Sequence, residues 1–215
     1  MPLHNKNGFT LVEVMVSVAV IGLLAVIMMT SLGSTRQTEE LKASARQLAA
    51  DIRSMQARAL AAGDVQACPN SSSLLSICED STAACTNPAD CVAHVPSAFG
   101  VNASSSATYY TLFAEVEPST ADFHLTRPTE VLLSRPLLQG TSQNVVIKNV
   151  LTGKPAPLLS KTAGDVSFMR QSGNTRLNDG SGLEPDIMVF RLWHKVSSST
   201  VDVEVNRVTG RVSVL

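Results

Sequence analysis

The sequence contains few charged and few aromatic residues. Of its 215 residues only 16% are charged and 4% are aromatic, and 17 Lys and Arg face 18 Asp and Glu for a net charge of −1. Typical soluble domains carry about 25% charged residues. A nearly neutral chain argues against a protein that coats nucleic acid or an anionic membrane surface, and the shortage of aromatic rings argues against a platform that stacks single-stranded bases.

The sequence also lacks the patterns of the common catalytic sites. It contains no H-E-x-x-H, G-x-S-x-G or Walker pattern, each of which reflects a defined metal, nucleophile or phosphate chemistry. His4 lies close to the amino terminus, and His94, His124 and His194 stand alone. We therefore expect a protein that is not an enzyme and that needs no cofactor.

Charge is almost absent from one stretch near the amino terminus. Residues 9–32 form a run of 24 in which Glu13 is the only charged residue. At ~1.5 Å per residue, a helix of this length crosses the ~30 Å hydrocarbon core of a bilayer. A buried core helix would normally show a polar face, and an ordinary secretory signal would end in a small-residue cleavage site. The run therefore indicates a membrane-spanning helix.

The peptide GFTLVE, residues 8–13, resembles the type IV prepilin signature. The resemblance implies that residues 1–8 are a leader, that prepilin peptidase cuts after Gly8, and that the new amino terminus at Phe9 is methylated. It also implies that Glu13 sets the register of subunits during filament assembly.

The physical chemistry of Glu13 agrees with that role. A carboxylate costs ~2.5 kcal/mol or more at the centre of a bilayer and needs a partner there. Cleavage would supply the amino group of Phe9, one helical turn away on the same subunit and within reach of a neighbouring subunit. An acid that snorkels to the membrane face is the alternative.

Residues 33–62 continue the helix with an amphipathic pattern. Apolar residues recur in steps of three and four at Leu41, Ala45, Leu48, Ile52, Met55, Ala59 and Ala62, which predicts one buried face. Gly63 and Asp64 supply a stop. We expect one helix over about residues 9–62, roughly 80 Å long, with its second half packed under a globular head formed by residues 63–215. A coiled coil is the alternative.

The head is expected to be an antiparallel β-sheet packed on the second half of the helix, which gives an α+β fold. Its strand-like segments are rich in β-branched residues and are separated by Gly, Pro and Asn turns. They are residues 108–117, 144–150, 165–170, 186–196, 200–206 and 211–215. The last two flank a short Gly-containing turn and predict a hairpin.

The first part of the head is acidic and holds all four cysteines. Residues 63–126 contain seven acids and no Lys or Arg, with Cys68, Cys78, Cys85 and Cys91 among them. If the head lies outside the cytoplasm, we expect two disulfides that staple a long loop over residues 68–91. The spacing leaves all three connectivities open.

The head offers two sets of candidate metal ligands, and neither is expected to bind a metal. Zinc is disfavoured because the cysteines include no C-x₂-C pair and no His lies at ligand spacing. The segment 174–186 offers Asp179, Glu184 and Asp186 as calcium ligands, but its spacing does not fit an EF-hand loop. We expect a turn there.

Two weaker features of the head resemble the GspH/FimT type of minor pilin or pseudopilin. Residues 55–65, MQARALAAGDV, lead into Cys68 and are similar to that family's helix end, glycine turn and first strand. The segments VSF, VEV and GRV near the carboxyl end are similar to its last strands. With the signature, the resemblance covers both ends of the chain; residues 69–160 match nothing that we can name.

Some competence-associated members of that family bind DNA through a Gly-Arg-x-Arg turn. The corresponding residues 210–213 are Gly-Arg-Val-Ser, so the second Arg is absent. Arg207 and Arg211 are the candidate DNA contacts, and a hairpin with ordinary solvent-facing arginines is the favoured alternative.

The resemblance therefore implies a filament subunit with prepilin peptidase, other pilin or pseudopilin subunits and an inner-membrane assembly platform as partners. It implies a single-pass protein of the bacterial inner membrane, with its head in the periplasm, that later enters a type IV pilus or a type II secretion pseudopilus. The alternatives are a major pilin and a tip or competence pilin whose head binds DNA or a surface ligand. The apolar run lacks the proline of many major pilins, which favours a minor subunit.

Overall fold

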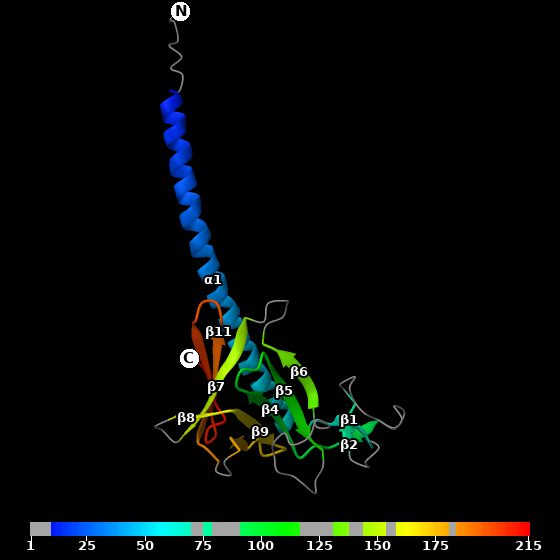
Figure 1. Ribbon diagram of the computed structural model, residues 1–215. Helices are drawn as coiled ribbons and strands as arrows, with labels where there is room; N and C mark the ends of the chain where they lie inside the picture. The colour runs from blue at the N-terminus through cyan, green and yellow to red at the C-terminus, as the bar shows by residue number, and fades with distance from the viewer. Residues whose placement is uncertain are drawn as a thin grey trace, which may run out of the picture.

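The computed structural model describes residues 10–69, 75–78, 91–116, 131–137, 144–153, 158–180 and 184–215. In these ranges one helix, α1 (Leu11–Leu60), precedes thirteen strands, and every strand pairing is antiparallel. The first half of α1 projects alone from a β-rich head that packs around its second half (Figure 1). The expected α+β fold with a long amino-terminal helix is confirmed.

The helix is continuous, and its amphipathic half forms the centre of the head. Six of the seven apolar residues predicted for its buried face are at most 2% exposed, namely Leu41, Ala45, Leu48, Ile52, Met55 and Ala59. Ala62 is only half-buried because it lies past the helix end with φ 52°. The N–H of Gly63 then bonds to the carbonyl of Arg58 at 3.0 Å, which satisfies a helix-end carbonyl.

Two five-stranded sheets and one small sheet make up the described part of the head, where a single sheet was expected. One large sheet has the order β10-β9-β4-β5-β6 and the other β13-β12-β11-β7-β8. The strands of the first are β4 (Ala98–Ser104), β5 (Tyr109–Glu115), β6 (Val131–Pro136), β9 (Ala163–Met169) and β10 (Thr175–Asn178). Those of the second are β7 (Val145–Gly153), β8 (Leu159–Lys161), β11 (Ile187–His194), β12 (Thr200–Asn206) and β13 (Val212–Val214).

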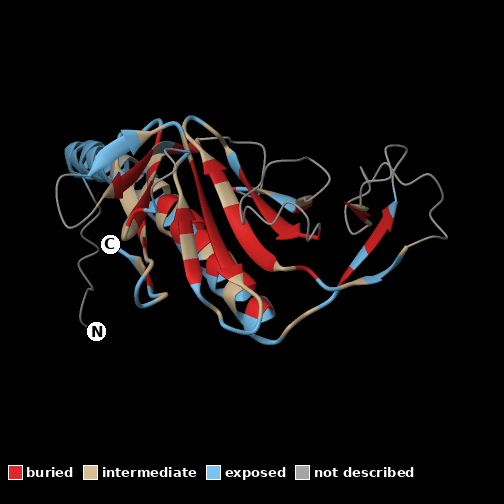
Figure 2. Cartoon of the chain, turned by 90° about the horizontal axis from the view of Figure 1, so that it is seen from below, coloured by how far each residue is buried: buried red, intermediate tan, exposed pale blue. Residues whose placement is uncertain are grey.

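Both large sheets bury one face against α1. The helix contacts β4 and β9 of the first sheet and β11, β12 and β13 of the second, and the second half of the helix and the strands carry most of the buried residues in Figure 2. The sheets meet at Gly164, where an added Cβ would lie 2.8 Å from Val150 and 2.9 Å from Met188. The helix therefore packs on both sheets, and the absence of a side chain at Gly164 lets the sheets contact each other directly.

The small sheet, of order β2-β1-β3, lies to one side of the larger sheets (Figures 1 and 2). Its strands are β1 (Val65–Pro69), β2 (Leu75–Ile77) and β3 (Val92–His94). Ala67 on the central strand faces Ile77 on one side and Val92 on the other. The expectation of a long loop over residues 68–91 is therefore wrong for Cys68, which lies in β1, and for residues 75–77, which form β2.

Candidate functional site

The candidate site is the amino-terminal half of α1, whose first turn is closed by Thr10. The Thr10 hydroxyl accepts a 3.3 Å hydrogen bond from the N–H of Glu13. A Thr at the N-cap and a Glu three residues later form the T-x-x-E pattern of a capping box, and an acid in the first turn also favours the helix dipole. Sequence reasoning missed Thr10, although this four-residue pattern marks it.

Glu13 lies in that first turn with its side chain exposed. The structure therefore gives it a local contribution to helix initiation in addition to the assembly role that was expected. Gly8 and Phe9, the expected cleavage and methylation residues, lie outside the described residues.

The apolar half of α1 projects from the head (Figure 1). The 18 residues Leu11–Met28 are long and apolar enough to cross a membrane, and none of them is buried. Leu11 is 76% exposed and Ile21 is 65% exposed. Apolar surface on this scale is unfavourable in water and marks contact with lipid or with other protein.

Residues 3–29 match the family model described as the prokaryotic N-terminal methylation motif. The chain has a type IV pilin-like amino terminus. The matched residues include the expected cleavage point, the helix cap and the whole apolar span, so the motif and the exposed helix describe the same segment. The comparisons with curated proteins and with solved structures returned no match.

The pilin-like helix enters the head beside a fully buried histidine. His194, at the end of β11, is 0% exposed, and its Nε2 lies 3.5 Å from a carboxylate oxygen of Glu40. Its Nδ1 accepts a 3.2 Å hydrogen bond from the N–H of Ser197. The ring therefore presents its Nε2 atom to Glu40, and the β11–β12 turn lies against the helix.

The three described cysteines lie in or next to the strands of the small sheet. Cys78 and Cys91 form a disulfide, and Cys68 is also disulfide-bonded. Cys85 lies outside the described residues. The Sγ atoms of Cys68, Cys78 and Cys91 lie within 4.8 Å of one another, because Cys68 lies near the end of the central strand, Cys78 directly follows β2 and Cys91 directly precedes β3. This is the one cluster of potential metal-ligand side chains among the residues that the structure describes.

The acids considered for calcium lie in ion pairs. Asp179 accepts a 2.8 Å hydrogen bond from the hydroxyl of Thr152 and lies 3.2 Å from Lys161. Glu184 and Asp186 pair with arginines instead. The three carboxylates are not brought together.

The two candidate DNA contacts have different environments. Arg207 donates a 2.7 Å hydrogen bond to Asp186, and this bond raises the pKa of its guanidinium. Arg207 also lies 3.6 Å from Glu184. Arg211 is exposed on the β12–β13 turn. The positive charge of Arg207 is thus balanced by carboxylates of the same head.

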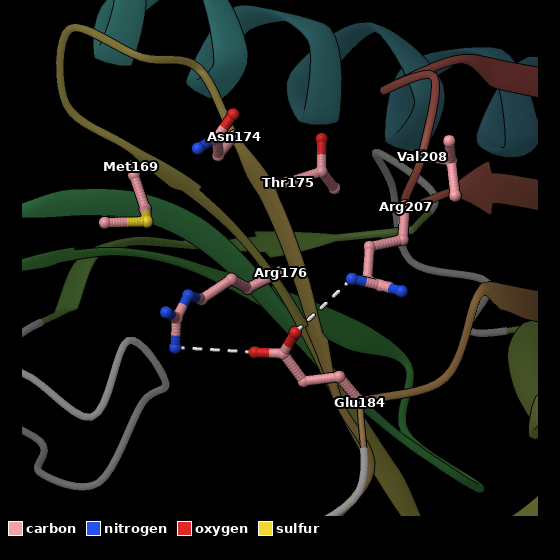
Figure 3. Close-up of a pocket in the computed structure, with 7 residues that line it drawn as sticks. All are labelled: Met169, Asn174, Thr175, Arg176, Glu184, Arg207 and Val208. Atoms are coloured by element: carbon pink, nitrogen blue, oxygen red, sulfur yellow. Dashed lines mark ion pairs between the residues drawn. The ribbon is translucent and has the colours of Figure 1, made fainter.

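A polar pocket of about 360 Å³ surrounds Arg207 (Figure 3). Glu184 lies between two guanidinium groups, 3.4 Å from Arg176 and 3.6 Å from Arg207. The remaining lining residues are Met169, Asn174, Thr175 and Val208. Glu184 thus links Arg176 of β10 to Arg207 of the β12–β13 turn across the pocket.

Proposed function

We propose that the protein is a minor pilin or pseudopilin of the GspH/FimT type. Prepilin peptidase would cut after Gly8 and methylate Phe9, and an inner-membrane assembly platform would insert the mature chain among other pilin or pseudopilin subunits. The anchor, residues 9–32, would hold the chain in the bacterial inner membrane with its head in the periplasm. The mature chain would then enter a type IV pilus or a type II secretion pseudopilus.

The observation that carries this proposal is the division of α1 into two environments. Leu11–Met28 is wholly exposed, whereas Leu41, Leu48 and Ile52 on the same helix are buried in the head. The exposed half can be covered by lipid before assembly and by neighbouring helices afterwards, since both surroundings are apolar. A single helix thus suits a subunit that is stored in a membrane and then extracted.

The cysteines support a periplasmic head. Disulfides persist in oxidising compartments and are rare in the cytoplasm, and no free cysteine is found in the described residues. The small sheet has three strands of at most five residues, and the disulfide between the segments next to two of them stabilises it.

The alternatives are less well supported. A head that binds DNA through its candidate arginines needs several of them free to contact phosphates. Arg207 is paired with Asp186, and Arg191 makes two hydrogen bonds to Asp202 at 2.7 and 2.8 Å, which leaves Arg211 as the exposed one of the two candidate contacts. A major pilin is the other alternative. A major pilin would be abundant in sheared filaments, whereas a minor pilin would be scarce there.

Incorporation into filaments tests the assembly role. We expect Glu13→Ala to be processed and to stay in the membrane but to be lost from sheared filaments, because its carboxylate would no longer meet the amino group of a neighbour. Glu39→Ala is the matched control, since it removes the same charge from an exposed part of α1 where Glu39 pairs only with Lys42 at 3.4 Å among described residues. Normal incorporation of Glu13→Ala would contradict the proposal.

A further inference from the structure

The β11–β12 turn, residues 195–199, lies at the end of the head that faces the apolar half of α1. His194, immediately before the turn, lies against Glu40. At the other end of the same sheet, Arg53 donates a 2.8 Å hydrogen bond to the carbonyl of Val212, and Gly210 lies against Gln56. The strands therefore run alongside the helix, with the turn toward its amino-terminal half (Figure 1).

The length of helix between the apolar run and Glu40 sets the height of this turn above a membrane. Glu40 lies eight residues after Leu32, the end of the apolar run, which is about 12 Å of helix. The turn extends about two residues past His194 toward the membrane, roughly 7 Å of extended chain. It therefore lies about 5 Å above the hydrocarbon, within a headgroup layer about 5–7 Å thick on each side.

The side chains at this end of the sheet suit a lipid headgroup layer. Val196 is 63% exposed, and Lys195 beside it is exposed. Trp193 is partly exposed on the same strand end, with the Lys148 ammonium 5.5 Å from its ring centre. Tryptophan and lysine are the residues that favour the membrane interface, the ring for its amphipathic character and the ammonium for its attraction to anionic lipid.

The net charge at this end is positive. The helix residues there cancel, because Arg36 pairs with Glu40 at 3.0 Å and Lys42 with Glu39 at 3.4 Å. No carboxylate of the described residues lies within ion-pair distance of Lys148 or Lys195. Two lysines are thus left to meet an anionic surface.

We propose that the β11–β12 turn docks through Lys195 and Val196 on the anionic headgroups of the bilayer that anchors the chain, with Trp193 and Lys148 just above the headgroup layer. The contact holds the head upright on the membrane before assembly and is broken when the subunit is extracted. This inference rests on the proposed membrane anchor, and it adds a second, reversible contact with the same bilayer.

The single tryptophan of the chain provides a native probe. The full chain is placed in nanodiscs that contain phosphatidylcholine with a nitroxide on its headgroup, with or without phosphatidylglycerol, and Trp193 fluorescence is recorded. We expect strong quenching with phosphatidylglycerol and weaker quenching without it. Lys195→Glu should reduce the equilibrium constant for docking about thirtyfold, since each lysine near an anionic surface contributes about 1 kcal/mol and the reversal changes the charge by two units.

Two further variants make the test specific. Val196→Asp should also reduce quenching, because it removes the apolar contact and leaves Lys195 in place. Arg211→Glu makes the same charge reversal on an exposed turn at the opposite end of the sheet and should leave quenching unchanged. Absence of quenching, equal quenching in both lipids, or an equal loss in Arg211→Glu would overturn the docking contact. A chain that stays in the nanodisc without quenching would leave the anchor standing, so the two failures are distinguishable.

Discussion

The hydroxyl of Tyr110 donates a 2.5 Å hydrogen bond to the carboxylate of Asp51 and so joins β5 to the helix at the centre of the head. Tyr110 is 1% exposed. Gln47 donates a 3.2 Å hydrogen bond to the same hydroxyl, and Arg135 lies 3.4 Å from the Asp51 carboxylate. A polar cluster thus fixes the position of the helix against a sheet that otherwise packs on it through apolar side chains.

Replacing this hydroxyl should weaken the head. We expect Tyr110→Phe to lower the free energy of unfolding by about 1–3 kcal/mol, because a buried hydrogen bond to a charged group is lost. Tyr109→Phe is the control, since Tyr109 is 54% exposed, and it should change the free energy little. Denaturant titration of both variants in detergent measures the difference, and equal effects would show that the Asp51 contact contributes nothing.

The same contact predicts a loss of stability at high pH. Burial, followed by the hydrogen bond and charge of Asp51, raises the pKa of Tyr110 above its ordinary value of 10.0. Because the folded pKa is raised, the contribution of Tyr110 is intact below pH 10.0 and is lost as the pH rises above it. Unfolding free energies should be measured below and above pH 10.0. Between the two, the free energy should fall more for the wild type than for Tyr110→Phe. Parallel pH profiles would contradict this assignment.

The disulfide pattern is a further prediction. Since Cys78 pairs with Cys91 and Cys68 is also bonded, we expect Cys85 to be the partner of Cys68. Peptide mapping under non-reducing conditions, with free thiols blocked at acid pH, should recover these two cross-linked pairs. Removing the Cys78–Cys91 bond, which closes a separation of 13 residues, should make the small sheet more sensitive to protease. A Cys68–Cys78 or Cys68–Cys91 peptide would contradict the pattern.

Gly164 should tolerate no side chain. A Cβ there would lie 2.8 Å from Val150 and 2.9 Å from Met188, so that Gly164→Ala forces the two large sheets apart and should cost about 1–3 kcal/mol of unfolding free energy. Gly22→Ala is the control, because a Cβ at Gly22 meets nothing within 4 Å. Equal thermal unfolding of the head in the two variants would show that the sheets adjust without cost.

The parts of the fold that sequence predicted are those with strong periodicity. The helix stripe from Leu41 to Ala59 follows a helical period and is buried as expected. The segment 200–206 alternates apolar and polar residues and has the predicted bounds in β12. Such patterns are local, so they can be recognised without knowing what the segment packs against.

The parts that sequence missed depend on distant partners. β4, Ala98–Ser104, has few β-branched residues, yet it is a central strand because β5 and β9 pair with it on both sides. At Gly100 a Cβ would overlap the Phe113 ring, so packing against β5 requires a glycine there. The contact between Glu40 and His194 likewise joins residues that no motif relates. Tertiary pairing decided these cases against local propensity.

The mass of the mature amino terminus tests the central claim most directly. Mass spectrometry of the protein purified from membranes should show a chain that begins at Phe9 with a methylated amino group, and Gly8→Ala should keep residues 1–8. A mature chain that begins elsewhere, or a Gly8→Ala variant that is still cut after residue 8, would contradict the account.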